Sequence, residues 1–218
     1  MIWTRPSIMH SSSALLVAAA LTFPGNGRSQ PGATSDALAH VQAIVAAAPN
    51  GDRAFRADAG GVVVQVQSGA VCVQGAAKML LTKVEVFPTP PLGSDVGCEY
   101  QLQGGGLTSI FVSPLGSTNF DQAVDEIVRD IVKLHPGASL TNGPLTATLP
   151  SLEAPRAAAF AMSIDGQPSI TSVWIARQGK WLITVRATYP ASARHDPELL
   201  SSFQVLNIQS AIQRRDAG

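Results

Sequence analysis

The chain has 218 residues and a formal net charge of zero, with 15 basic and 15 acidic side chains. A neutral chain without runs of like charge lacks the basic stripe of a nucleic-acid surface, so we predict no nucleic-acid partner. Hydrophobic residues make up 45% of the chain and charged residues only 14%. This composition provides enough apolar material for one well-buried core, or at most for two small domains.

The N-terminal segment has the pattern of an export signal. One arginine and no acid precede residues 14–23, ALLVAAALTF. About ten apolar residues match the core of a signal peptide and fall short of a membrane span. A buried first helix is the alternative, but Pro24 and Gly25 end the segment too early for one. We therefore predict a signal peptide and flexible leader over residues 1–30, a periplasmic or secreted location, and no transmembrane segment in the mature protein.

The next segments predict one helix followed by strands. Residues 35–48 have apolar side chains on one helical face, and Pro49 ends the pattern. From Arg53 to Ser113 the pattern is that of strands, at 61–67, 79–87, 96–102 and 107–113. The last two strands flank three consecutive glycines, Gly104–Gly106, a composition typical of a hairpin turn.

Two cysteines, Cys72 and Cys98, lie within this strand region. In an oxidising compartment two thiols usually pair. A redox pair is more often written C-x-x-C, and two cysteines without a nearby histidine make a poor zinc site. We predict a structural disulfide that closes a loop of roughly 27 residues and contributes about 3 to 4 kcal/mol. We predict no metal site and no cofactor.

The clearest helix is predicted over residues 120–134. Its apolar residues recur every three or four positions along one stripe: Phe120, Ala123, Val124, Ile127, Val128, Ile131 and Leu134. Thr118 or Asn119 can cap its start, and Pro136 follows its end. A long connection over 138–155 follows, with one expected edge strand at 145–149.

The remaining chain predicts a strand meander and a closing helix. Strands are expected at 156–164, 169–176 and 181–190, with turns at Asp165-Gly166 and Gln178-Gly179. The closing helix begins near Asp196, which we predict to be its N-cap, with Pro197 in the first turn. Its expected apolar stripe consists of Leu199, Leu200, Phe203 and Leu206.

This order of elements predicts an α+β fold. Runs of antiparallel strands separated by a few helices favour a mostly antiparallel sheet with about three helices packed on it, braced by the disulfide. The chain has no internal repeat and no clear boundary. We therefore treat residues 31–218 as a single α+β domain.

The second half, about residues 107–212, resembles the PsbP/Mog1-type fold. The resemblance rests on a strand ending near Pro114, a helix opening with FDQAVDEI, a long connection, a meander with an Asp-Gly turn, the segment WLITVRATYP and a closing helix. It implies a secreted or lumenal α/β/α sandwich that acts as an accessory or binding protein, usually without catalysis. The first half, with its cysteine pair, matches no family pattern.

Catalytic motifs are absent from the sequence. It contains no G-x-S-x-G, H-E-x-x-H, Walker A or EF-hand pattern, and no G-x-G-x-x-G before a helix. Three of its histidines, His40, His135 and His195, are far apart in the chain. We therefore name no catalytic residue. A site assembled from distant residues, such as a serine, a histidine and an aspartate, stays open as the alternative.

Arg186 is the candidate binding residue, because a guanidinium in the middle of a strand is costly to bury unless it has a partner or faces water. If a helix covers its face, we expect a carboxylate of helix 120–134 to pair with it, since an unpaired buried charge is costly. If the face is open, Arg186 with Thr184, Thr188 and Tyr189 can bind an anionic group. Plain solvent exposure is the third reading.

These observations favour an exported, non-enzymatic accessory or ligand-binding protein of the cell envelope. Its partner is then an envelope protein or a small anionic ligand. One alternative is a secreted hydrolase with a site assembled from distant residues. The other is an envelope protein–protein interaction module that uses an exposed apolar patch.

Overall fold

The computed structural model describes residues 31–74 and 78–218. The predicted signal peptide therefore lies outside the described residues. The helices are α1 (Pro31–Ala47), α2 (Gly51–Ala54), α3 (Phe120–Leu134) and α4 (His195–Asp216), with a short 3-10 turn at Ala191–Ala193. The strands are β1 (Phe55–Asp58), β2 (Val62–Gln65), β3 (Val71–Val73), β4 (Met79–Val86), β5 (Val96–Leu102), β6 (Leu107–Pro114), β7 (Ser139–Leu140), β8 (Arg156–Ile164), β9 (Gln167–Gln178) and β10 (Trp181–Pro190).

The strands form two sheets in which all paired neighbours are antiparallel. Seven strands form a large sheet in the order β4-β5-β6-β10-β9-β8-β7, and three form a small sheet in the order β1-β2-β3. The α+β prediction is confirmed. The three longer helices are those that the sequence predicts, although α1 begins at Pro31 rather than near residue 35, and α2 adds one further turn.

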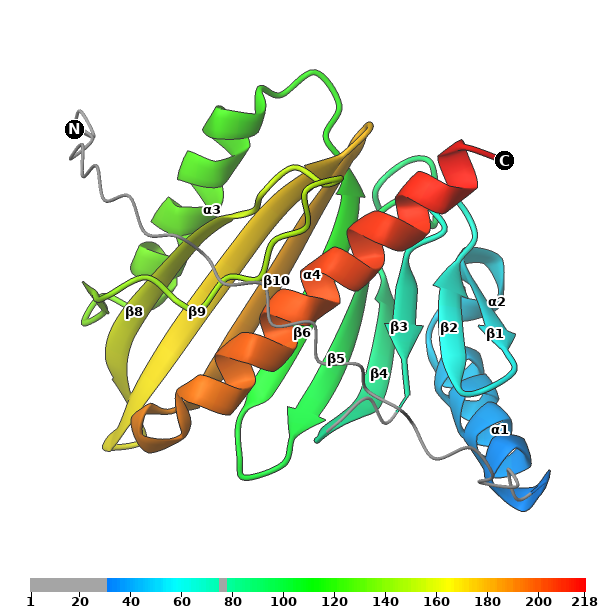
Figure 1. Cartoon of the computed structure of the whole chain (residues 1–218), viewed down its shortest axis with the longest axis horizontal. Helices are drawn as coiled ribbons and strands as arrows, with labels where there is room; N and C mark the ends of the chain where they lie inside the picture. The colour runs from blue at the N-terminus through cyan, green and yellow to red at the C-terminus, as the bar shows by residue number, and fades with distance from the viewer. Residues whose placement is uncertain (1–30, 75–77) are drawn as a thin grey trace, which may run out of the picture.

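One face of the large sheet, which we call the closed face, is covered by α4, α1 and the small sheet. α4 crosses this face diagonally, and α1 and the small sheet lie beyond it at the β4 end (Figure 1). Val185 of β10, Ile208 of α4 and Val63 of β2 are fully buried in one shared core. Burial of this apolar surface is the main stabilising contribution to the fold.

The disulfide joins the two sheets across this core. Cys72 of β3 and Cys98 of β5 are bonded, with their Cα atoms 6.5 Å apart. Both side chains are buried in the closed-face core. The predicted pairing is confirmed, and its position explains how a three-stranded sheet with few partners of its own is held on the larger sheet.

The described residues cover only part of the opposite face, which we call the open face. α3 packs on it over β8 and β9, on the side away from α4 (Figure 1). Phe120 and Ile131 of α3 contact Phe160, Val173 and Ile175 of the sheet in a second core. As predicted, the Asn119 side chain caps the helix by accepting from Asp121 N at 2.8 Å. The apolar stripe of α3 is therefore buried only in part: Phe120 and Ile131 are buried, whereas Ile127 is half-buried and Leu134 is exposed.

The connection over 141–155 differs from the prediction. It contains no strand at 145–149, and the edge strand that exists is β7 at Ser139–Leu140. This segment, which we call the strap, is held by hydrogen bonds to side chains of β9 and α4. Trp174 Nε1 donates to Leu145 O at 3.0 Å, and Ala147 N donates to Ser202 Oγ at 2.6 Å. These hydrogen bonds satisfy the strap's backbone without strand pairing.

The start of α4 also differs from the prediction. Asp196 does not cap the helix; its carboxylate accepts from Lys78 Nζ at 2.7 Å. Two residues of the expected apolar stripe, Leu199 and Phe203, are exposed. The buried face instead includes Ser202 and Gln209, which donate to or accept from the strap.

Candidate binding groove on the open face

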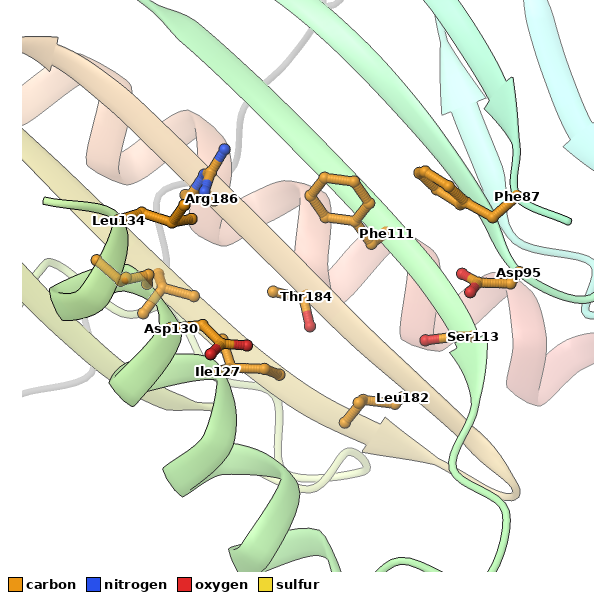
Figure 2. A pocket seen from close by; sticks show the side chains of 12 residues that line it. Phe87, Asp95, Phe111, Ser113, Ile127, Asp130, Leu134, Leu182, Thr184 and Arg186 are labelled. Carbon is orange, nitrogen blue, oxygen red and sulfur yellow. The ribbon is translucent and has the colours of Figure 1, made fainter. Parts of the chain in front are cut away.

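The part of the open face that α3 leaves uncovered forms a groove of about 360 Å³. Its floor is the outer side of β10 and β6, and α3 forms one wall (Figure 2). Leu182, Thr184 and Arg186 point into it from β10 because alternate residues of a strand share a face. From α3, Ile127 and Leu134 face it across the floor.

Two aromatic rings form the other side of the groove. Phe87 follows β4 and Phe111 lies on β6, with ring centroids 6.0 Å apart. Gly97 pairs with Phe111 in the β5–β6 register. A Cβ at Gly97 would lie 3.4 Å from the Phe111 ring and 3.3 Å from Ile110 O. Because Gly97 has no side chain, the Phe111 ring can pack directly over it on the sheet.

Arg186 is partly buried in this groove and has no carboxylate partner among the described residues. Among the residues that the structure describes, no ion pair within 4.0 Å involves Arg186. The expectation that a carboxylate of α3 pairs with it is therefore wrong. The reason is geometric: α3 covers β8 and β9, so its exposed Asp130 lines the groove without reaching the guanidinium.

Asp95 lies at the far end of the groove. It precedes Val96, which pairs with Val112, whereas Arg186 pairs with Ser109. Strand geometry over this register separates the two charged residues by roughly 16 Å. Burial raises the pKa of the Asp95 carboxyl above its ordinary value, and a hydrogen bond from Thr89 Oγ1 at 3.1 Å opposes the shift. The groove thus has Arg186 at one end, the Asp95 carboxyl at the other, and a mostly apolar middle with Asp130 on the α3 wall.

The structure brings some of the predicted binding residues together and separates one. Thr184 lines the groove beside Arg186. Thr188 is on the same face of β10, and its hydroxyl lies 2.9 Å from that of Thr171. Tyr189 belongs to the closed-face core, so it cannot contact a ligand that Arg186 holds. Residues that the sequence reasoning missed are Phe87, Asp95 and Phe111, which come from separate segments.

On the closed face, Tyr189 takes part in a buried hydrogen-bond network. Its hydroxyl donates to Glu198 Oε1 at 2.8 Å and lies 2.6 Å from Ser172 Oγ. Burial is the main cause that raises the pKa of the Tyr189 phenol. Arg194 Nε also donates to Glu198 Oε1, and Leu145 N donates to Oε2. The carboxylate is thus fully engaged in fixing the strap to α4.

The described histidines do not converge on the groove. His40 Nε2 lies 3.3 Å from Leu81 O, His135 follows α3, and His195 begins α4. Within residues 31–74 and 78–218, no cluster of three or more metal-binding side chains is present. Among the helices of the described segments, none combines the length and hydrophobicity needed to cross a membrane.

Comparison with known proteins gives little beyond the fold description. No family model and no curated protein matches the chain. Among solved structures, the chain is similar to LpqN of Mycobacterium tuberculosis, described as involved in cell envelope biogenesis. That similarity has a TM-score of 0.31 and 12% identity, and it covers 62% of this chain and 77% of LpqN.

Proposed function

We propose that the chain is an exported, non-enzymatic ligand-binding protein of the cell envelope, and that the open-face groove binds a small amphipathic molecule with an acidic group. The observation that carries this proposal is Arg186, a partly buried residue without an ion-pair partner among the described residues, in a groove with largely apolar lining. The signal-like N-terminus supports the location, and the disulfide is consistent with an oxidising compartment.

The lining of the groove fits this class of ligand. Small-molecule sites are mostly apolar, with a few polar groups that set orientation. Here Phe111, Leu182 and Ile127 supply apolar contact, and Thr184 adds one hydroxyl to the floor of the groove. An arginine presents a planar fork of donors that matches a carboxylate or a phosphate. A bound acidic group would therefore offset the cost of keeping Arg186 partly out of water.

The PsbP/Mog1-type resemblance of residues 107–212 is part of the same proposal. Members of that fold class act as accessory or binding proteins, usually without catalysis. The resemblance adds no residue to the groove, and the proposal rests on Arg186 and its surroundings.

Octanoate and octylamine test the proposal, because they share a chain length and differ in charge. We expect calorimetric titration to detect octanoate binding and to find octylamine at least about tenfold weaker, since a hydrogen bond to a charged group contributes about 1.5 to 3 kcal/mol. Arg186→Gln should weaken octanoate binding by about tenfold or more. Arg129→Gln, on the exposed side of α3, is the matched control and should bind as the wild type.

Two results would contradict this function. One is no octanoate binding to the wild type. The other is equal octanoate affinity for the Arg186→Gln and Arg129→Gln variants, which would mean that Arg186 does not select the anion.

A further inference from the structure

We propose that the ligand of the open-face groove is a long-chain amphiphile, whose acidic head lies at Arg186 and whose apolar chain continues past Phe87 into a second groove between α1 and β4. This inference rests on the proposed function and extends it to the class of ligand.

The second groove lies along the β4 edge of the large sheet and has a volume of about 660 Å³. One wall is the C-terminal half of α1 and the residues after it, including Ala43, Ala47 and Pro49. The other wall is β4, with Val84 and Val86 among its side chains. Alanine side chains fill little of the space between a helix and a sheet edge, which explains why this volume is left open.

Phe87 belongs to the lining of both grooves. Its ring lines the open-face groove beside Phe111, and the same residue lines the groove between α1 and β4. Phe87 lies three strand spacings from Arg186, in the order β10-β6-β5-β4, and four residues further along the strands, which together correspond to about 20 Å. A short ligand held at Arg186 would therefore end within the open-face groove, whereas a longer chain would extend toward α1.

The charges of the second groove favour an uncharged chain. Its lining includes Lys83 and Glu85, which form an ion pair with each other. The Nζ of Lys83 is thus already paired with Glu85, so this wall has no unpaired charge from these two residues and offers mainly apolar contact. A ligand with one acidic end and a plain hydrocarbon chain matches one guanidinium at one end and mostly apolar side chains along the rest. The carboxyl groups of Asp95 and Asp130 also line the open-face groove, away from the guanidinium.

Affinity as a function of chain length provides the test. Each buried methylene should tighten binding by up to about fourfold, the equivalent of about 0.8 kcal/mol. We expect equilibrium dialysis below the micelle-forming concentration to give palmitate at least about tenfold higher affinity than octanoate for the wild type. In Ala47→Trp the indole should fill the second groove, so that palmitate loses part of its advantage over octanoate.

Ala46→Trp provides the matched control. Ala46 is the neighbouring exposed residue of α1 and does not line the groove. This variant should keep the full advantage of palmitate. Octanoate affinity should be the same in both tryptophan variants and the wild type. Ala43→Trp, on the same wall one turn earlier, replaces Ala47→Trp if circular dichroism finds that variant unfolded.

The outcomes separate the two proposals. If octanoate binds through Arg186 but palmitate gains nothing, or keeps its full advantage in the groove-filling variant, this inference is overturned and the proposed function stands. If neither acid binds the wild type, both proposals are wrong.

Discussion

The two faces of the seven-stranded sheet differ in how they are covered, and neighbouring residues of β10 differ in burial as a result. Ile183 points to the closed face and is fully buried, whereas Leu182 points to the open face and is only partly buried. The closed face has α4, α1, a second sheet and a disulfide over it, while the open face has one helix over part of its width. The fold is therefore stabilised mainly from one side, which leaves the other side available for a groove.

The sharpest test of this difference uses these two neighbours. Ile183→Ala should lower the free energy of unfolding by roughly 4 kcal/mol, because truncation of a fully buried isoleucine loses its transfer free energy and leaves a cavity. Leu182→Ala should cost about 1 kcal/mol, since water and the groove already contact that side chain. Urea unfolding of both variants provides the comparison. Similar losses at the two positions would mean that both faces are equally covered.

Local patterns were sufficient to predict most of the fold. The stripe from Phe120 to Leu134 and the turns at Asp165 and Gln178 depend on residues near in sequence, and each element lies where they place it. The disulfide could be predicted from the expected oxidising compartment and from the presence of two cysteines alone. These features need no knowledge of what packs on them.

The closing helix could not be predicted in the same way. Ser202 and Gln209 are buried because the strap passes over them and its backbone bonds to their side chains. Leu199 and Phe203 are exposed because α4 buries a different arc of its surface against the sheet. The pattern of apolar residues in the helix cannot predict that a polar face is buried, because the hydrogen-bond partners of that face are backbone atoms distant in sequence.

The candidate site was predicted only in part for the same reason. The alternation on β10 put Arg186 and Thr184 on one face, but whether that face is open depends on where α3 lies across the sheet. Phe87 and Asp95 reach the groove from the two ends of the loop between β4 and β5, and no local sequence pattern indicates this. One contact could have been found: the hairpin around Gly104–Gly106 sets a register in which Gly97 lies opposite Phe111.

The disulfide is the second way to test the closed face. Reduction should lower the free energy of unfolding by about 3.5 kcal/mol on the chain-entropy model, given a separation of 26 residues. Because the bond lies behind the sheet and does not line the open-face groove, we expect octanoate binding by the folded, reduced protein to be unchanged. Unfolding curves and titrations with and without dithiothreitol measure the two effects. A loss of binding at unchanged stability would contradict this separation of the faces.

Gly97→Ala tests whether the position of Phe111 on the open face shapes the groove. The added methyl group would lie 3.3 Å from Ile110 O, a tight contact that needs a small backbone shift, so we expect a loss of about 1 kcal/mol in stability. The methyl group would also contact the Phe111 ring at 3.4 Å, so a shift of that ring should narrow the groove and weaken octanoate binding. Gly137→Ala is the control, because a Cβ there meets nothing within 4 Å. Unchanged binding by a folded Gly97→Ala variant would mean that the position of Phe111 does not shape the site.

The smallest effect is expected at the exposed ion pair between Lys78 and Asp196, at the start of α4. Both side chains are more than half exposed, so water and salt screen their attraction. If apolar burial dominates the closed face, Lys78→Ala should shift the urea midpoint only slightly at low salt, and the shift should vanish in molar salt.

The same ion pair predicts the direction of a pH effect. The hydrogen bond from Lys78 is the main cause that lowers the pKa of Asp196 below its usual 3.8. A carboxyl whose pKa is lower in the folded state stabilises the fold above its unfolded pKa, and this contribution is lost as the pH falls through the folded value. The difference in midpoint between wild type and Lys78→Ala should therefore be present at neutral pH and disappear in acid. A difference that persists below that range would assign the effect of Lys78 to packing rather than to its charge.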